Sequence, residues 1–572
     1  MPAPDLTRRE RDTLVALCRP LLVADTFTEP ASVREIAAEL VVTEAAVKQH
    51  LANLYFKFGI AKGARRRLLL ANEAIRVGAI TSSDLEGSRP VVPVENDVLE
   101  SGRAAVDRHD WSLGHELLKT AAKRRALGGD DLERLAQAAL WVGEDAESMD
   151  AHQNAYQAYV GEGRTDRAAY VAAMLVIHHG RRLELAVAGG WYAKLQTLLQ
   201  EVPNERGEGY LALATTMLNE ASGDWEAALE NAGGTLAAGR ACADPDLTAL
   251  GLAFEGLALC HKGEVSEGAR RLDEAMASAI GGDLTMMSTG IVYCRTLCAS
   301  LALHDFRRAI EWADAIEHCR TATGMGGFPG DCRTHRAEAL FMHGAWAEGQ
   351  SEAQVATTES EVWHRPHAGI ALYELGVINL RLGSLERAER AFLEAHAHGY
   401  PPQPGLALLR LAQGNHNAAD EAITGALSDS TLDSLARARL LPARTEIALA
   451  CGDNLAAQEA AAELIAIGER FETPALRAAG LTARGAAALA DDQADAATAD
   501  LGLGATLWRE AEVPYEAART RALLGEAQLA RGERNAALLE LGAAVITFEE
   551  LGAQPDADAV NERIAALSTD TG

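Results

Sequence analysis

The chain has 572 residues, too many for a single hydrophobic core, so at least two domains or an array of repeats are expected. No run of about 18 apolar residues occurs, and the first residues lack an apolar segment, which argues against a membrane span and against secretion. The eight cysteines show neither disulfide nor zinc spacing, and aromatic residues make up only 5%, so a cytoplasmic, mainly helical protein is expected.

Charge is unevenly divided along the chain. The first 80 residues hold 12 Lys and Arg and 9 Asp and Glu, a net charge of +3, whereas the whole chain carries −29. The remainder therefore carries −32. Because an acidic surface repels nucleic acid, any contact with DNA is expected in the first 80 residues. The acidic surface of the long remainder is equally explained by solubility alone.

The first predicted helix begins at a capping box, Thr7 with Glu10, and turns Leu14 and Leu17 inward before Pro20 ends it. Residues 32–60 then read SVREIAAELVVTEAAVKQHLANLYFKFGI. They predict a short helix, a tight turn, and a second helix whose apolar stripe is Val47, Leu51, Leu54 and Phe58. Such a unit is the helix-turn-helix of DNA-binding proteins.

A fourth helix is predicted from about residue 64 to residue 77, starting with three arginines. The four helices would enclose one small core, made of Leu14, Leu17, Ile36, Leu40, Val47, Leu51 and Leu54.

Residues at about a dozen positions resemble, in order, the LuxR-type helix-turn-helix of bacterial transcription regulators. They are Leu6-Thr7, Arg9-Glu10, Arg34 to Ala37, Leu40, Val47-Lys48, His50 and Lys57 to Ile60. The loop before the second helix is about ten residues longer than the family pattern, Thr43 replaces the usual serine, and Ala46 replaces the usual threonine. The resemblance implies that residues 1–82 bind double-stranded DNA, as a homodimer on a symmetric site.

Nine residues are candidates for DNA contact. On the outward face of the second motif helix lie Ala45, Lys48, Gln49, Ala52 and Asn53, and the resemblance places Lys48, Gln49 and Ala52 against bases. Candidates for phosphate contact are Arg34, Thr43, Arg65 and Arg66. Alanines offer no hydrogen bond to a base, so modest sequence specificity is expected.

After a polar linker at 83–97, the chain repeats itself. Residues 372–395 match the tetratricopeptide pattern through Leu372, Leu375-Gly376, Gly383, Ala388, Phe392 and Ala395. Copies of its small-residue position stand at Gly256, Gly485 and Gly525. Gly376 and Ala388 would mark a close crossing of two antiparallel helices, with Phe392 filling the space between neighbouring pairs.

Nine turn signals follow one another at a mean spacing near 39 residues: Gly223, Gly263, His304, Gly344, Gly383, Gly414, Gly452, Asp492 and Gly532. The fold expected is therefore all-α, a helix-turn-helix domain at 1–82 (motif 32–60) followed by a tetratricopeptide-like α-solenoid of about ten helix pairs at 98–565. A disordered tail is expected at 566–572.

The repeat region resembles the effector half of large LuxR-type regulators, although no GxxxxGK[ST] phosphate loop occurs. The resemblance implies that a protein, peptide or small-molecule effector binds its concave face.

No constellation for catalysis, a cofactor or a metal is recognised, so the chain is not expected to be an enzyme. Cys294 and Cys298 are four residues apart with His304 nearby, but small core residues explain them better than a metal site does. Trp225 and Trp346 follow turn glycines, where they would brace the junctions between repeats.

Two functional hypotheses remain. The first is a DNA-binding transcriptional regulator whose repeats sense an effector. The alternative is a non-catalytic helical-repeat scaffold whose N-terminal module docks a protein partner.

Overall fold

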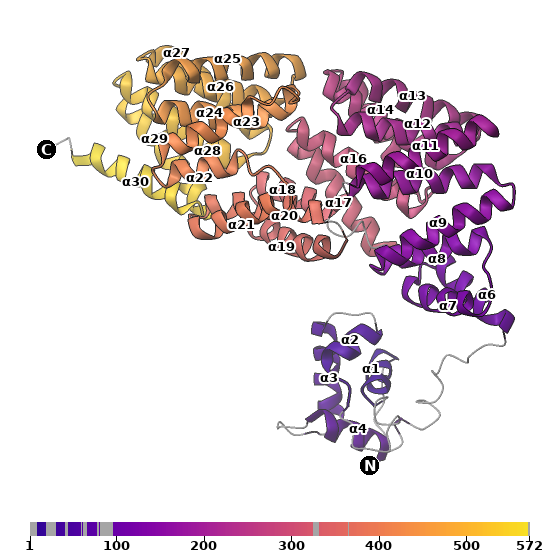
Figure 1. Ribbon diagram of the computed structural model, residues 1–572. Coiled ribbons are helices and arrows are strands. Elements are labelled where there is room, and N and C mark those ends of the chain that lie inside the picture. Colours follow the sequence, from indigo (N-terminus) through magenta and orange to yellow (C-terminus); the bar gives the residue numbers. More distant parts are fainter. Residues whose placement is uncertain are drawn as a thin grey trace. The chain divides into compact units, whose positions relative to one another are not determined.

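The computed structural model describes residues 8–18, 30–40, 44–58, 60, 66–76, 79–80, 95–182, 184–323, 331–363 and 365–569. Every regular element within these ranges is a helix (Figure 1). The chain divides into two compact units, residues 1–98 and 99–572. Among the helices searched in these ranges, none is both long and apolar enough to cross a membrane.

The described residues of the first unit form four helices before α6 (Glu95–Asp107). They are α1 (Arg8–Cys18), α2 (Val33–Leu40), α3 (Glu44–Lys57) and α4 (Arg66–Arg76). Six of the seven predicted core residues are buried, and Leu40 is half-buried because it lies at the end of α2. Helix α4 adds Leu70, Ala71 and Ala74 to the same core.

The segment before α2 is fixed at both sides by backbone groups of Ala31. Its N–H donates to the carbonyl of Leu17 at 3.2 Å, and its carbonyl accepts from Nη1 of Arg67 at 3.0 Å. These bonds join α1 and α4 to the start of α2. They fix the position of α2, and only residues 41–43 separate α2 from α3.

The second unit is an α-solenoid of twelve antiparallel helix pairs in the described residues (Figure 1). Their bounds, pair by pair, are α6 (Glu95–Asp107) with α7 (Trp111–Arg124), α8 (Gly129–Trp141) with α9 (Asp145–Gly161), α10 (Thr165–Arg181) with α11 (Leu185–Glu201), α12 (Glu205–Ala221) with α13 (Trp225–Ala241), α14 (Pro245–Lys262) with α15 (Val265–Gly281), α16 (Met286–Ala302) with α17 (Phe306–Thr323), α18 (Asp331–Met342) with α19 (Trp346–Trp363), α20 (Arg365–Arg381) with α21 (Leu385–Ala397), α22 (Gly405–Ala412) with α23 (His416–Leu427), α24 (Ser434–Ala450) with α25 (Asn454–Phe471), α26 (Pro474–Ala490) with α27 (Ala494–Glu510), and α28 (Pro514–Ala530) with α29 (Arg534–Leu551).

A single helix, α30 (Gln554–Thr569), follows the last pair. It extends into the tail predicted at 566–572, and α6 begins inside the linker predicted at 83–97. The expected number of about ten pairs was too low, because the region before residue 200 also forms regular pairs although its sequence period is weak.

All nine predicted turns lie between the two helices of a pair. Each of the nine signal residues has a positive φ, between 54° and 94°. Seven of them are glycines, which adopt this left-handed conformation without steric cost. His304 and Asp492 adopt it at φ 54° and 57°. The turn spacing therefore identified nine of the twelve pairs.

Close helix crossings recur at the small-residue positions. A methyl group at Gly376 would lie 2.4 Å from the ring of Phe392, and one at Gly525 would lie 2.8 Å from Cγ of Leu541. Gly256 and Gly485 face Leu272 and Leu501 in the same way, at 2.7 and 2.6 Å. The large residue 16 positions after each glycine thus fills the space that its missing side chain leaves within the pair. Phe392, predicted to lie between neighbouring pairs, also contacts Gly405 of the next pair.

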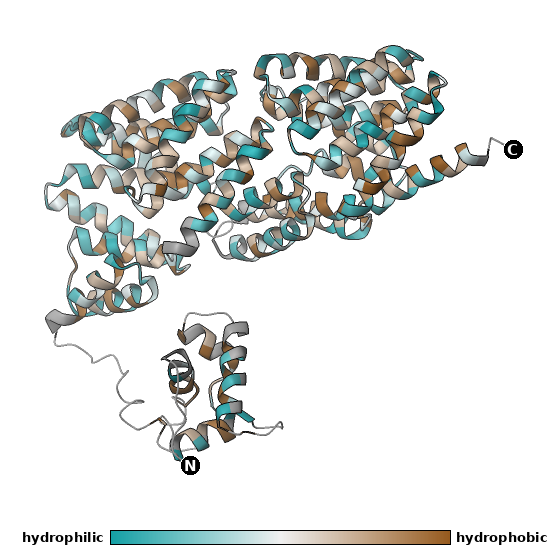
Figure 2. Ribbon diagram, turned by 180° about the vertical axis from the view of Figure 1, so that it is seen from behind, coloured by the Kyte–Doolittle hydropathy of each residue, from teal (hydrophilic) through white to brown (hydrophobic). Residues whose placement is uncertain are grey.

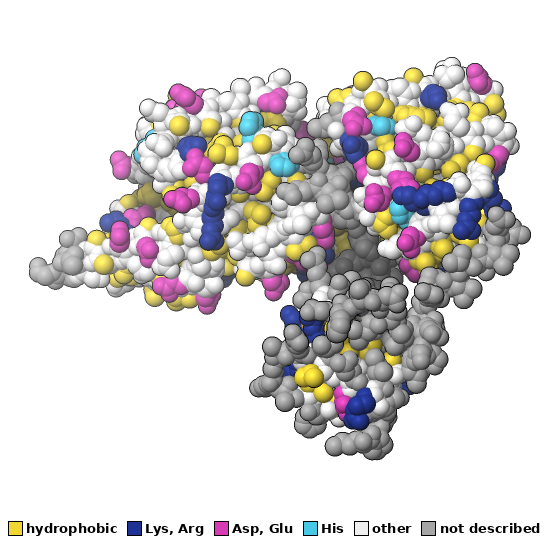
Figure 3. All heavy atoms as spheres, turned by 60° about the horizontal axis from the view of Figure 1, so that its bottom comes forward, with side chains coloured by type: hydrophobic (Ala, Val, Ile, Leu, Met, Phe, Trp, Pro, Cys, Tyr) yellow, Lys and Arg dark blue, Asp and Glu magenta, His cyan; other side chains and the backbone are white. Residues whose placement is uncertain are grey.

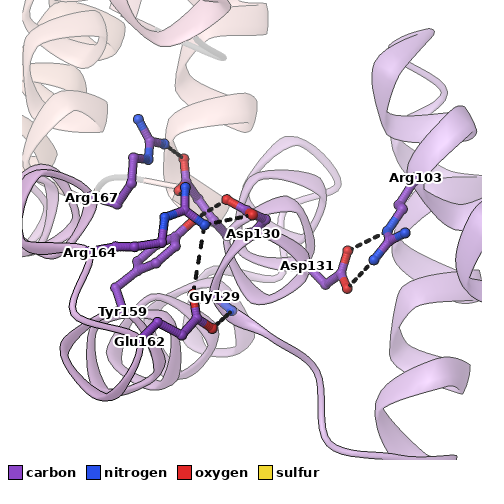
Figure 4. A network of polar contacts seen from close by, with 9 residues as sticks. Arg103, Gly129, Asp130, Asp131, Tyr159, Glu162, Arg164 and Arg167 are labelled. Carbon is purple, nitrogen blue, oxygen red and sulfur yellow. Dashed lines mark hydrogen bonds and ion pairs between the residues drawn. The ribbon is translucent and has the colours of Figure 1, made fainter.

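The first pairs are held together by buried charges (Figure 4). Arg103 on α6 donates two hydrogen bonds, at 2.7 and 2.8 Å, to Asp131 on α8. Tyr159 on α9 donates to Glu133 at 2.7 Å, and Glu133 also accepts from Arg167 on α10. Asp131 and Glu133 are each 6% exposed. Since every one of these carboxylates is paired, their burial carries no unsatisfied charge.

Successive turns of the superhelix contact each other. Gly344, between α18 and α19, packs on Pro514 at the start of α28, and Gly383 packs on Pro555 of α30. The hydroxyl of Thr473 donates to the carbonyl of Leu303 at 2.8 Å. The paired residues are about 170 positions apart, between four and five helix pairs along the chain. The solenoid therefore has contacts beyond those between neighbouring repeats.

Asp433 is the most connected residue of this turn-to-turn contact. Its Oδ2 accepts hydrogen bonds from Nε1 of Trp225 at 2.8 Å and Nδ1 of His261 at 2.6 Å. The two donor rings are stacked with centroids 3.7 Å apart. Burial opposes ionisation of Asp433, but the hydrogen bonds from His261 and Ala436 hold its pKa below the usual value. Trp225 therefore braces two superhelical turns, where only a junction between neighbouring repeats was predicted.

Acidic side chains are interspersed with lysine and arginine over the surface of the second unit (Figure 3). Hydrophobic and hydrophilic residues alternate along nearly all of its helices (Figure 2). Many acidic residues form ion pairs between helices, as between Arg437 and Glu463 or between Arg563 and Glu526. Part of the acidic content of the second unit therefore serves its structure.

Replacement of Asp433 by alanine tests the contact between turns. Asp433→Ala removes the N-cap of α24 together with both hydrogen bonds from the other turn, whereas Asp453→Ala removes only the equivalent cap of α25. We expect Asp433→Ala to lower the free energy of unfolding by about 1–3 kcal/mol more than Asp453→Ala, because it leaves two half-buried donors, Trp225 and His261, without their acceptor. Urea unfolding followed by circular dichroism measures the difference, and equal losses would contradict a stabilising contact between turns.

Candidate functional site

Two of the nine predicted DNA-contact residues have described, exposed side chains. Lys48 and Asn53 are both exposed on α3. Ala45, Gln49 and Ala52 lie on the same helix, and Arg34 lies on α2, but their side chains are outside the described part, as are Thr43 and Arg65 entirely. The buried stripe Val47, Leu51 and Leu54 faces the core, so Lys48 and Asn53 lie away from it.

Arg66 is engaged within the first unit. Its Nη2 and Nε donate to the carbonyl of Ile60 at 3.1 and 3.3 Å, and its guanidinium lies 4.0 Å from the centre of the Tyr55 ring. These contacts fix the start of α4 against the end of α3. A structural role therefore accounts for this arginine, and its predicted contact with phosphate stays untested.

A cavity of the second unit lies along the first helices of successive pairs. It has a volume of about 510 Å³ and is lined by α18, α20, α22, α24, α26 and α28, with His304 and Phe306 closing one part. Small-molecule sites in proteins have volumes of roughly 300–1,000 Å³. The effector was predicted to bind the concave face of the solenoid, and its binding to this cavity stays a prediction.

Aromatic side chains provide much of the cavity wall. Phe306, Phe341, Tyr373, Trp508 and Tyr515 all line it. The indole N–H of Trp508 donates to Oγ1 of Thr482 at 3.1 Å, and Tyr515 donates to Asp556 at 3.2 Å. Because these polar atoms are already satisfied by the protein, the aromatic rings are available for apolar contact.

Two arginines of the cavity are neutralised by carboxylates. Nη2 of Arg439 lies 3.1 Å from Oε1 of Glu338. Nη2 of Arg519 lies 2.5 Å from Oε2 of Glu446, and its Nη1 lies 3.3 Å from Oε2 of Glu516. These pairs join α18, α24 and α28 across the cavity. Removing one partner would leave a buried charge without compensation.

Two further groups of the cavity are unmatched. Arg381 forms no ion pair with any described residue, and its guanidinium stacks over the ring of Tyr515 with 5.0 Å to the ring centre. Glu374 is 3% exposed, and its buried Oε1 has no hydrogen-bond partner in the described part of the chain. Burial, together with the charge of Glu338, raises the pKa of Glu374 well above the usual value.

The unmatched groups are seven residues apart on α20 and thus about 10 Å apart along the helix axis. One is a cation and the other a carboxyl group whose raised pKa favours the protonated form, and a protonated carboxyl group, like a guanidinium, can donate a hydrogen bond to an acceptor. Sequence inspection did not single out either residue. Their only signal is a charged residue at an inward position of a repeat helix, next to Tyr373 and Leu380.

His304 lines this cavity. It is not among the residues that lie together with Cys294 and Cys298, the two cysteines beside which the sequence places it. Burial, with the charge of Arg439, lowers its pKa to about 3. Trp346 packs on Phe341 and Tyr515, with ring centres 5.2 and 5.4 Å apart, so it braces the wall of the cavity from the adjacent turn.

No protein-family model matches this chain, and no curated protein matches it in sequence. The likeness of residues 1–82 to the LuxR-type motif therefore stays a prediction.

Several solved structures are similar to the chain. The Cut9–Hcn1 hetero-tetramer of the APC/C is 13% identical with a TM-score of 0.41, and the match covers 82% of this chain and 96% of that one. Yeast Tom70 is 12% identical with a TM-score of 0.30 and the same coverage. A tetratricopeptide repeat protein from Parabacteroides merdae is 16% identical, with a TM-score of 0.26, covering 56% of this chain and 99% of that one. At these values the matches carry no function over to this chain.

The protonation of Glu374 predicts a pH-dependent stability. Because its pKa is higher in the folded than in the unfolded chain, the folded state binds the proton more tightly, and stability falls as pH rises above about 4.5. Glu374→Gln keeps a neutral group of the same shape. We expect its Tm to exceed that of the wild type increasingly between about pH 5 and about pH 8. Glu421→Gln, an exposed change on α23, provides the control, and parallel pH profiles for all three proteins would contradict a buried, protonated Glu374.

Proposed function

We propose that this chain is a non-catalytic helical-repeat protein that binds an effector in the cavity along α18 to α28. The observation that carries the proposal is the pair of unmatched polar groups, Arg381 and Glu374, within an otherwise aromatic and ion-paired wall. Arg381 is half-buried and forms no ion pair with any described residue, and the buried Oε1 of Glu374 has no hydrogen-bond partner in the described part of the chain. Polar groups left in this way are costly unless something binds to them. A ligand that accepts hydrogen bonds from both removes that cost.

The chemistry of the wall indicates an elongated organic anion with an apolar body, as a small molecule or as the acidic end of a peptide. Its anionic group would pair with Arg381, whose planar guanidinium suits a carboxylate. A second acceptor would take the proton of Glu374 in a hydrogen bond. The apolar body would pack among Phe341, Tyr373 and Trp508.

The proposal can be tested with two dyes that differ in one charge. 1-Anilinonaphthalene-8-sulfonate is an apolar anion, and N-phenyl-1-naphthylamine is the same molecule without the sulfonate. We expect the full chain to bind both, and Arg381→Ala to weaken the anionic dye by about tenfold or more while leaving the neutral dye within about twofold. Fluorescence titration measures both affinities.

Arg390→Ala is the matched control, since Arg390 is exposed on α21 in the adjoining helix of the same pair. It should leave both dyes unchanged. If Arg381→Ala affects neither dye, or weakens both equally, Arg381 is not an anion site and the proposed effector class is wrong.

A second function, DNA binding through residues 1–82, is supported by a specific arrangement. Helices α2 and α3 are joined by three residues, and α3 carries Lys48 and Asn53 on its exposed side. This is the placement that a recognition helix needs. We propose this role for the first unit, together with the homodimer that a symmetric site would require. The alternative is that the same unit docks a protein partner.

Salt dependence separates these two roles of the first unit. If the full chain binds DNA, its affinity for duplexes should fall steeply between about 50 and about 200 mM salt, because phosphate contacts release counterions. Selection from a pool of random duplexes should enrich some sequences, and Lys48→Ala or Gln49→Ala should weaken binding to them, while Lys123→Ala on the exposed surface of α7 should not. An absence of both enrichment and salt-sensitive binding would favour the protein-docking role.

A further inference from the structure

Three potential metal ligands meet between α16 and α18. Cys294 and Cys298 are one turn apart on α16, and His335 comes from α18, 37 residues beyond Cys298. The two Sγ atoms are 4.0 Å apart, and Sγ of Cys298 is 3.3 Å from Nε2 of His335. All three ligand atoms lie within 4.8 Å of one another.

These distances match those of ligands around one metal ion. Zinc binds thiolate sulfur at about 2.3 Å and imidazole nitrogen at about 2.0–2.1 Å, so two sulfurs on one ion are about 3.8–4.0 Å apart, and sulfur and nitrogen about 3.5–3.8 Å apart. The observed sulfur–sulfur distance lies in that range, and the sulfur–nitrogen distance is a few tenths of an ångström shorter. Small side-chain rotations would admit an ion.

The surroundings suit a soft cation. A cavity of about 240 Å³ adjoins the three residues, and the thioether of Met217 also belongs to its lining. Nη1 of Arg295, the residue after Cys294, lies 2.8 Å from Oε1 of Glu220, so the positive charge of this arginine is compensated. Two thiolates and a neutral imidazole would balance a divalent ion.

We propose that Cys294, Cys298 and His335 bind one soft d10 metal ion, Zn²⁺ or Cu⁺, with a further coordination position open to the adjoining cavity. Thiolate and imidazole are the ligands that these ions prefer over magnesium or calcium. Three protein ligands with one open position are typical of zinc sites that take up an exogenous ligand. The site is separate from the cavity proposed for the effector.

Metal binding would join two helices that the chain connects only through α17 and residues 324–330. Helices α16 and α18 are the first helices of neighbouring pairs and already pack together. A bond from each to one ion would fix their spacing. The proposed site is therefore also a place where metal availability changes the rigidity of the solenoid.

The test uses the full chain, freed of metal by a chelator and kept reduced. Zn²⁺ affinity is measured by competition with a chromophoric chelator and Cu⁺ affinity by competition with bathocuproine disulfonate, and the tighter competition identifies the ion. Substitution with Co²⁺ reports thiolate ligation through charge-transfer absorption. We expect one ion per chain, and slower amide hydrogen exchange in α16 and α18 when the ion is bound.

Cys298→Ser and His335→Gln each remove one ligand, and Cys451→Ser, at an exposed cysteine between α24 and α25, removes none. Mutation of a residue that only hydrogen-bonds to a metal ligand typically weakens metal affinity by about 10–100-fold. Loss of a direct ligand should therefore weaken it by at least about tenfold. His335→Gln decides the outcome if Cys298→Ser does not fold, as judged by its metal-free circular dichroism. Metal affinity that is unchanged in the folded variants, or equally reduced in Cys451→Ser, would overturn the proposal.

Discussion

The close crossing of two helices at a residue without a large side chain is the constraint on which the second unit depends. Gly376, Gly485 and Gly525 each admit the large residue that follows 16 positions later. This contact fixes the distance and angle within a pair, and hence the rotation from each pair to the next. Because the rotation is repeated along the chain, the pairs wind into a superhelix.

The superhelix is tight enough that its turns touch, and this contact has two structural effects. It covers Trp346, and partly covers Trp225 and Asp433, at positions that an open solenoid would expose further to solvent. It also places α28 opposite α20 and α24, which encloses the cavity between them. The contact between turns thereby encloses a cavity of defined volume where an open array would leave a groove.

The local pattern of the chain predicts the pairs well and the contacts between distant pairs poorly. Turn residues with positive φ and glycines opposite large residues are determined within about 40 positions, so all nine turn signals were located correctly. The meeting of Gly344 with Pro514, or of Cys298 with His335, depends on rotations accumulated over one or several pairs. No residue near Glu374 signals in sequence that its carboxyl group is unpaired. In the first unit six of the seven predicted core residues are buried, but the residues that α4 and the segment before α2 add to the core, such as Leu70 and Ala31, were not predicted.

The touching turns also change how the protein would respond to a pulling force. An open α-solenoid extends gradually, as a soft spring whose coils separate from the start. Here the stacked ring pair of Trp225 and His261, clamped by Asp433, and the proline contacts of Gly344 and Gly383 must break before the coils separate. Extension therefore begins only above a threshold tension. The second unit is stiff below that tension and extends elastically above it.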